Sequence, residues 1–178
     1  MPTQKELEQL EKAKATFEEI MKVHMREPFD DKEFQTFWGN VIRLKKYNCK
    51  VSHVPVSNAK GGRKVMPLKQ LQEQKITVGL GTDGPMSGNL MDMQSTLYFC
   101  NKIHKTNLED REFLTAFETF KLATIEGAKA LNMQEQIGSL EIKKRADLSI
   151  INPKTTNMFP IFDYYSALVN AMRPNNIE

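Results

Sequence analysis

The chain has 178 residues, 26% of them charged, which fits one domain of ordinary size with a real core. The net charge is only +3, and apart from residues 143–145 the basic residues are spread along the chain, so no nucleic-acid partner is indicated. No apolar run approaches membrane-spanning length, and no membrane partner is expected. Two cysteines without CxxC spacing, together with the absence of a signal peptide, predict a cytoplasmic protein.

Two amphipathic helices are expected at the start of the chain. Apolar residues recur at helical spacing over residues 5–25. A second helix is expected to run to about Tyr47, capped by Asp30 or Asp31. His24 lies on the apolar face of the first helix, where a lone histidine is more often a packing residue than a metal ligand.

A strand, a helix and a second strand follow. Residues 49–54 are expected to form a strand, residues 57–62 a polar loop, and residues 67–74 a helix. Residues 76–80 are short, β-branched and apolar, which is typical of a strand buried on both faces. The connection has the length of a right-handed parallel crossover, so the two strands are predicted to be adjacent and parallel.

Asp83 stands at the carboxyl end of the second predicted strand, and His53 at the end of the first. In parallel α/β architectures this edge collects ligands and catalytic groups. The alternative is that Asp83, Gly84 and Pro85 form only a turn, in which Asp accepts local hydrogen bonds and Gly supplies a positive φ. Taken alone, an Asp-Gly after a strand is more often that turn.

The second half of the chain is predicted to be mainly helical at first. Residues 90–103 and 111–130 are expected to form helices, the latter interrupted near residues 123–127.

Less regular structure is expected towards the carboxyl end. A turn at residues 138–141 leads into a strand at residues 145–151. The tail from residue 157 is expected to be loop-like, with a short element near residues 165–171.

Six sequence motifs occur in a specific order between residues 50 and 176. They are HVPVSN at 53–58, GLGTDG at 79–84, ATIEGAKAL at 123–131, IGSLE at 137–141, ADL at 146–148, and PIFD at 160–163 with YSALV at 165–169. Together they resemble the carboxyl-terminal half of the amidohydrolase superfamily. The order and spacing point to its branch of methylthioadenosine and S-adenosylhomocysteine deaminases, chlorohydrolases and guanine-deaminase-like enzymes.

The resemblance implies an α/β fold, namely the last strand units of a metal-dependent (β/α)8 TIM barrel with part of a small β-sandwich domain. Residues 1–45 are then a helical segment without a clear counterpart in the family. Residues 46–145 correspond to the carboxyl-terminal part of the barrel, and residues 146–178 to an incomplete β-sandwich return and tail. Lys143 stands where the family's turn usually carries a glycine.

The resemblance also implies a metal-dependent hydrolase acting on carbon–nitrogen bonds other than peptide bonds, above all by hydrolytic deamination of a nucleoside or purine-like amine. Asp83 matches the aspartate that binds the divalent metal and takes a proton from the attacking water. Zinc is the expected metal, with iron as the alternative. The partner is a small-molecule substrate.

Five further residues are expected near that site. His53, Ser57 and Asn58 match a pocket-lining motif, with a role in orienting substrate or supporting the metal-binding residues. Ser87 and Asn89 are expected to support the Asp83 loop. For the serines and asparagines of this set, ordinary loop geometry is an equally strong alternative.

Much of the family's metal site has no counterpart in the sequence. Family members supply two ligands from a His-x-His motif, whereas this chain has three histidines and no such motif. The expectation is a fragment of the full enzyme that lacks an amino-terminal half or assembles as a homo-oligomer; the alternative is a non-catalytic remnant or interaction module. Because a lone aspartate cannot hold zinc, this chain is expected to bind zinc only weakly.

Overall fold

The first unit of the chain contains one described helix of several turns. The computed structural model describes residues 4, 8 and 31–178, and divides into two units, residues 1–49 and 50–178. Helix α2, Asp31–Lys46, confirms the second helix predicted from the sequence, and its last turn is basic, which complements the negative end of the helix dipole. The helix predicted over residues 5–25 falls, except for Glu8, outside the described residues, as does His24.

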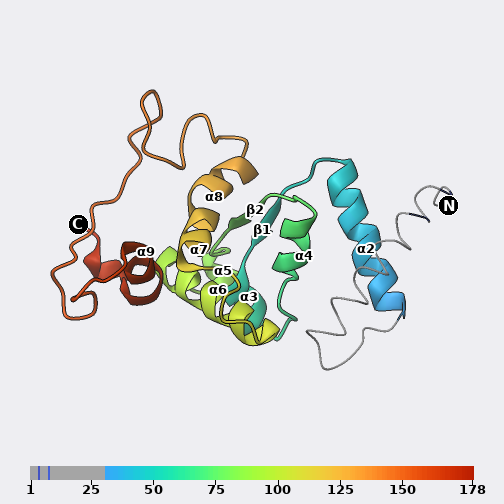
Figure 1. Cartoon of the computed structure of the whole chain (residues 1–178), viewed down its shortest axis with the longest axis horizontal. Coiled ribbons are helices and arrows are strands. Elements are labelled where there is room, and N and C mark those ends of the chain that lie inside the picture. Colours follow the sequence, from blue (N-terminus) through green and yellow to red (C-terminus); the bar gives the residue numbers. More distant parts are fainter. Residues whose placement is uncertain (1–3, 5–7, 9–30) are drawn as a thin grey trace. The chain divides into compact units, whose positions relative to one another are not determined.

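The second unit is built on two parallel strands (Figure 1). Strand β1, Val51–His53, pairs with β2, Val78–Leu80, so that His53 lies opposite Leu80. Every residue of β2 is buried, as its apolar run predicts. The predicted parallel pairing is confirmed, although both strands are shorter than the sequence pattern suggests.

Two short helices connect these strands. Helix α3, Pro55–Lys60, follows β1 directly, and α4, Leu68–Glu73, buries Leu68 and Leu71. The prediction of a loop from residue 57 onward is therefore wrong for its first four positions. Pro55 occupies the first turn of α3, where its fixed φ suits the helix and its missing N–H costs no bond.

The other side of the sheet packs against the helices that follow later in the chain. In Figure 1, β1 and β2 lie between α4 and the pair α7, Ala116–Ala123, and α8, Ile125–Ala130. A Cβ atom on Gly79 would lie only 2.9 Å from the Cα of Gly127 on α8. Glycine at position 79 is therefore what lets this helix approach β2 so closely.

Two helices follow Asp83, and the longer of them begins at a capping side chain. Helix α5 is the single turn Pro85–Gly88, and α6, Met93–Leu108, begins at Asp92, whose carboxylate accepts hydrogen bonds from two backbone N–H groups of the first turn. Helix α6 thus starts three residues later and ends five residues later than the span predicted from the sequence.

The predicted helix over residues 111–130 starts later and divides as expected. Thr115 and Glu118 form a capping box, which sets the start of α7. The predicted interruption is confirmed at Thr124, whose φ and ψ of −121° and −103° separate α7 from α8.

The strand predicted over residues 145–151 does not form. Only Ile151 is bridged, to Ile177, while Leu148 and Ile150 are 58% and 59% exposed. Apolar alternation is not sufficient for a strand, since the backbone also needs a neighbouring strand to pair with. Beside the bridge, the oxygen of Ile150 accepts a hydrogen bond from Glu178 N–H, and the described residues supply no strand for positions 145–149.

The carboxyl-terminal element forms near its predicted position. Helix α9, Tyr164–Ser166, continues into a π-helical turn, Ala167–Ala171, and a short 3-10 helix, Pro174–Asn176, follows. Tyr165 packs against Phe117 of α7 with 4.7 Å between ring centroids. In the part of the chain that the structure describes, no helix combines the length and apolar character needed to cross a bilayer.

Candidate functional site

The carboxyl ends of β1 and β2 bring three polar side chains together. Ser57 Oγ, on α3, donates a hydrogen bond of 2.6 Å to Asp83 Oδ2 and lies 3.0 Å from Ser87 Oγ. Lys60 Nζ donates to the backbone oxygen of Ser87 at 2.7 Å. Because parallel strands end at the same edge, residues about thirty positions apart in the sequence meet here. We call this group, Ser57, Asp83 and Ser87, the mouth cluster.

Asp83 adopts a left-handed backbone conformation, with φ of +64°. Its Oδ1 accepts a hydrogen bond of 2.8 Å from the N–H of Gly84. The turn alternative assigned the positive φ to Gly84, but that residue has φ of −79°, so the assignment is wrong. Asp is one of the few residues that tolerates this region, because its short side chain bonds locally.

The Asp83 carboxyl is held in its charged form. The hydroxyl of Ser57 makes the largest contribution to lowering its pKa, followed by the hydroxyl of Ser87 and the N–H of Gly84. The side chain is exposed, so it is a solvent-accessible carboxylate at neutral pH. Each of its oxygens retains a lone pair for a further ligand, because each accepts few bonds from the protein.

A depression of about 530 Å³ opens at the mouth cluster. Four of its lining residues are among those that the sequence analysis selected: Ser57, Asn58, Asp83 and Ser87. The sequence analysis missed the other four: Lys60, Gly61, Arg63 and Met86. The Gly-containing segment after Asn58 was the available signal, because it carries two of the cations at this rim.

The remaining two predicted site residues lie apart from this depression. Asn89 is exposed and ends α5 with φ of +64°. His53 is 1% exposed, and its Nε2 lies 2.9 Å from the Nε2 of His104 on α6. Neither lines the 530 Å³ depression, and their roles in the site stay predictions.

The two buried imidazoles are neutral at physiological pH. Burial, reinforced by the charge of His104, lowers the pKa of His53 to about 3, and burial lowers that of His104 to about 4. Cys100, also on α6, lies near both, and burial raises its pKa to about 12. The sequence analysis did not connect His104 or Cys100 with His53. The signal available in the sequence was that Cys100 and His104 are four positions apart, which places both on one face of a helix.

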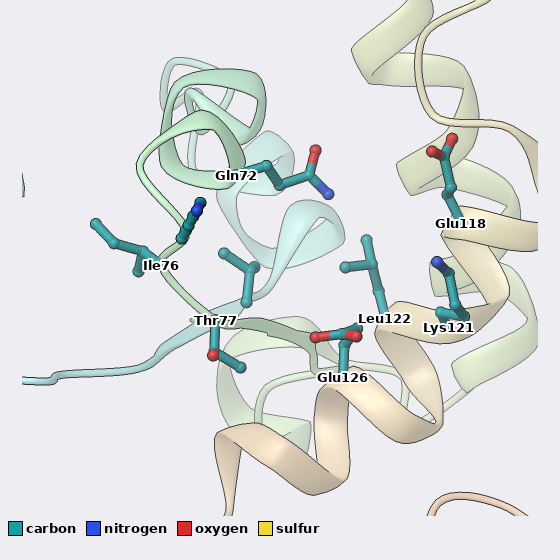
Figure 2. Close-up of a pocket in the computed structure, with 9 residues that line it drawn as sticks. Gln72, Ile76, Thr77, Glu118, Lys121, Leu122 and Glu126 are labelled. Carbon is teal, nitrogen blue, oxygen red and sulfur yellow. The ribbon is translucent and has the colours of Figure 1, made fainter. Parts of the chain in front are cut away.

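A second depression, of about 390 Å³, lies at the opposite, amino-terminal end of β2 (Figure 2). Figure 2 shows Glu118, Lys121 and Glu126 on helices α7 and α8, facing a wall that carries Gln72 and Ile76. Its cations and anions balance, with Lys75 as the second lysine, so it favours no charged ligand. This depression is separate from the mouth cluster.

Asp83 does not complete a metal site with the other described residues. Only one group of three metal-ligating side chains lies close together in the part of the chain that the structure describes, and it is His53, Cys100 and His104. Stable zinc sites use three or four protein ligands. Among the described residues, Asp83 therefore offers one carboxylate and no complete zinc site.

The sequence matches that of the amidohydrolase family over residues 3–178. The 5'-deoxyadenosine deaminase of Methanobrevibacter smithii is 38% identical over 117 residues, which cover 66% of this chain and 27% of the relative. The 5-methylthioadenosine/S-adenosylhomocysteine deaminase of Thermoanaerobacter pseudethanolicus is 36% identical over 135 residues, 76% of this chain and 31% of the relative. This chain thus spans about a third of the length of these curated relatives or less.

Solved structures show the same relationship. An adenosine deaminase from Xanthomonas campestris with bound zinc superimposes with a TM-score of 0.74 at 29% identity, covering 79% of this chain and 32% of that protein. The guanine deaminase of E. coli gives a TM-score of 0.71 at 26% identity, covering 79% and 33%. With a family match over nearly its whole length, this chain belongs to the amidohydrolase family.

Proposed function

We propose that this chain is the carboxyl-terminal part of a metal-dependent hydrolase that deaminates a nucleoside or a purine-like amine. The observation that carries the proposal is the exposed Asp83 carboxylate at the shared end of two parallel strands, held by Ser57 at 2.6 Å. The named deaminase relatives support the reaction class. In this proposal β1 and β2 are neighbouring strands of a (β/α)8 TIM barrel, and residues 146–178 belong to a β-sandwich that other segments complete.

Asp83 has two roles in the proposed reaction. One oxygen is a ligand position for a divalent ion, zinc before iron, in keeping with the zinc-bound Xanthomonas relative. The chemistry that such an ion supplies is a lowering of the pKa of water from about 15.7 towards neutrality. The carboxylate itself accepts the proton of the attacking water and returns it to the leaving amine.

Ser57 and Ser87 position this carboxylate. The Ser57 hydroxyl donates to Oδ2, and this bond fixes the rotation of the carboxylate plane while the Gly84 N–H holds Oδ1. Asn58, Lys60 and Arg63 line the adjacent depression and are the side chains available to contact a small-molecule substrate. The remaining metal ligands belong to an amino-terminal half or to another copy of the chain.

The proposal is tested in a complete protein, made by fusing this chain to the matching amino-terminal half of a deaminase relative. Asp83→Asn preserves volume and turn geometry but removes the proton acceptor. We expect ammonia release from adenosine-type or guanine-type substrates to fall by at least the roughly 10²–10⁴-fold that general-base catalysis contributes. Metal content and thermal midpoint are measured alongside.

Asp92→Asn is the matched control, because Asp92 caps α6 and asparagine caps helices equally well. It should leave the rate unchanged. Equal rates for wild type and Asp83→Asn at equal metal loading would contradict the proposal and favour a non-catalytic interaction module.

A further inference from the structure

Three side chains with metal-ligating atoms meet in the core between β1 and α6. His53 is the last residue of β1, while Cys100 and His104 lie one helical turn apart on α6. All three are buried, with exposed fractions of 0–1%. One ligand atom from each lies within 4.8 Å of the other two. We call this group the core triad; Asp83 is not part of it.

Hydrogen bonding alone does not satisfy the core triad. The two Nε2 atoms face each other at 2.9 Å, so one of them is a donor and the other an acceptor. The Nδ1 of His53 is buried and has no hydrogen-bond partner. Buried polar atoms in folded proteins almost always have a partner, so the hydrogen-bond network around the His53 ring is incomplete.

We propose that His53, Cys100 and His104 form a buried binding site for a thiophilic divalent ion, with Zn²⁺ as the best match. Two imidazole nitrogens and one thiolate are a ligand set that zinc uses. Softer metal ions also prefer nitrogen and sulfur ligands to oxygen ligands. The site is independent of the proposed deaminase function, because none of its residues lines the depression at Asp83. An ion here ties the end of β1 to the middle of α6.

The existing geometry is close to that of a bound ion. Two nitrogens at the usual zinc distance in a tetrahedral site are roughly 3.3 Å apart, so the facing Nε2 atoms need to separate by only about 0.4 Å. A nitrogen and a thiolate on the same ion are roughly 3.6 Å apart, within the present span of the triad. Side-chain rotations can supply such changes without moving the strand or the helix.

Proton balance is simple. The Cys100 thiol loses its proton to water as the sulfur–metal bond forms. The proton on the donor Nε2 must also leave that nitrogen, and Nδ1 of the same ring can take it. When His53 is that donor, its Nδ1 has no competing partner and accepts the proton. One proton is therefore released for each ion bound.

The test is a Co²⁺ titration of the purified, chelator-treated full chain. Cobalt substitutes for zinc and reports its ligands by absorption. We expect one equivalent to bind with a thiolate-to-cobalt charge-transfer band and the intense visible bands of tetrahedral cobalt, and Zn²⁺ to abolish both. Cys100→Ser should remove the charge-transfer band. His104→Gln should weaken binding by more than the roughly 10–100-fold that loss of an outer-shell partner costs.

Two control variants locate the ion. Cys49→Ser removes the chain's other thiol, which is exposed, and should leave the spectrum unchanged. Asp83→Asn should also leave it unchanged, so that binding at the mouth cluster is distinguished from binding at the core triad. The wild-type spectrum decides even if a variant does not fold: cobalt saturation without a thiolate band, or no binding at all, overturns the proposal. Loss of the band in Cys49→Ser or Asp83→Asn does so as well.

Discussion

At the scale of single residues, the mouth cluster shows what sequence patterns can predict. The position of Asp83 after a buried strand was sufficient to predict an exposed carboxylate at the sheet edge, and Ser57 and Ser87 were selected with it. Their contact depends on the parallel pairing, which the crossover length also predicts. The left-handed backbone of Asp83 could not be predicted, because Asp and Gly both tolerate it and only the folded turn selects between them.

The core triad was less accessible to sequence reasoning. His53 was expected near the pocket because it matches, with Ser57 and Asn58, a pocket-lining motif. In the structure its ring is buried and meets His104 of α6. Neither periodicity nor motif order states which helix covers a strand end. The sequence predicts weak zinc binding, because it considers Asp83 alone. The core triad predicts one bound ion, and the cobalt experiment above distinguishes the two expectations.

The buried histidines predict that the metal-free protein loses stability in acid. Both have a lowered pKa in the folded state, so the unfolded chain binds more protons below its own pKa of about 6.5. Stability is therefore fully present above about pH 6.5 and falls as pH drops towards about 4 for His104 and about 3 for His53. We expect each histidine to lower the free energy of unfolding by about 2 kcal/mol between about pH 7 and about pH 5.

Urea unfolding in the presence of a chelator measures this dependence. His104→Gln should show about half of the wild-type loss between the two pH values, because one titrating ring is gone. Leu97→Val, a buried change on the same helix, should lower stability at both pH values and keep the full pH dependence. The same loss in His104→Gln as in wild type would show that these rings are not held neutral.

At the scale of elements, the contact between β2 and α8 depends on one glycine. The sequence predicted the buried strand but not its closeness to this helix, because a glycine inside a strand is compatible with a bulge, a close approach or neither. The strand predicted over residues 145–151 failed for a related reason. Its alternation is real, but among the described residues only a one-residue bridge between Ile151 and Ile177 forms there.

Gly79→Ala should destabilise the chain by about 1–3 kcal/mol, the usual cost of overpacking. The new Cβ would meet the backbone Cα of Gly127 at 2.9 Å, and backbone cannot rotate away as a side chain can. Gly84→Ala is the matched control in the same segment, because nothing lies within 4 Å of its Cβ position and its φ is negative. Equal urea midpoints for the two variants would contradict this prediction, because they would mean that α8 moves away from the new methyl group at little cost in stability.

At the scale of the whole molecule, the second unit exposes an extended apolar segment. Leu148 and Ile150 are more than half exposed, and the backbone of residues 146–149 has no strand partner among the described residues. Extended segments with exposed apolar side chains and unpaired backbone are templates for association. This is the structural basis for the expectation that the chain assembles with another copy or with a missing half.

We expect the isolated chain to self-associate in a concentration-dependent way through this segment. The double variant Leu148→Glu, Ile150→Lys should move the sedimentation coefficient towards that of a monomer, because charges on an edge disfavour pairing. Met86→Glu changes an equally apolar side chain that is 97% exposed on α5, and should leave association unchanged. A wild-type chain that sediments as a monomer at all concentrations would contradict this expectation.

The short crossover between β1 and β2 also has a consequence for folding. The hydrogen bonds of the mouth cluster join residues separated by only 26 to 30 positions. The entropic cost of closing a flexible loop rises slowly with loop length, by about 0.6 kcal/mol for each doubling. A contact at this separation therefore costs less than one between residues a hundred positions apart. We therefore expect Asp83 and Ser57 to make this contact within residues 50–178 alone, without a partner segment beside them.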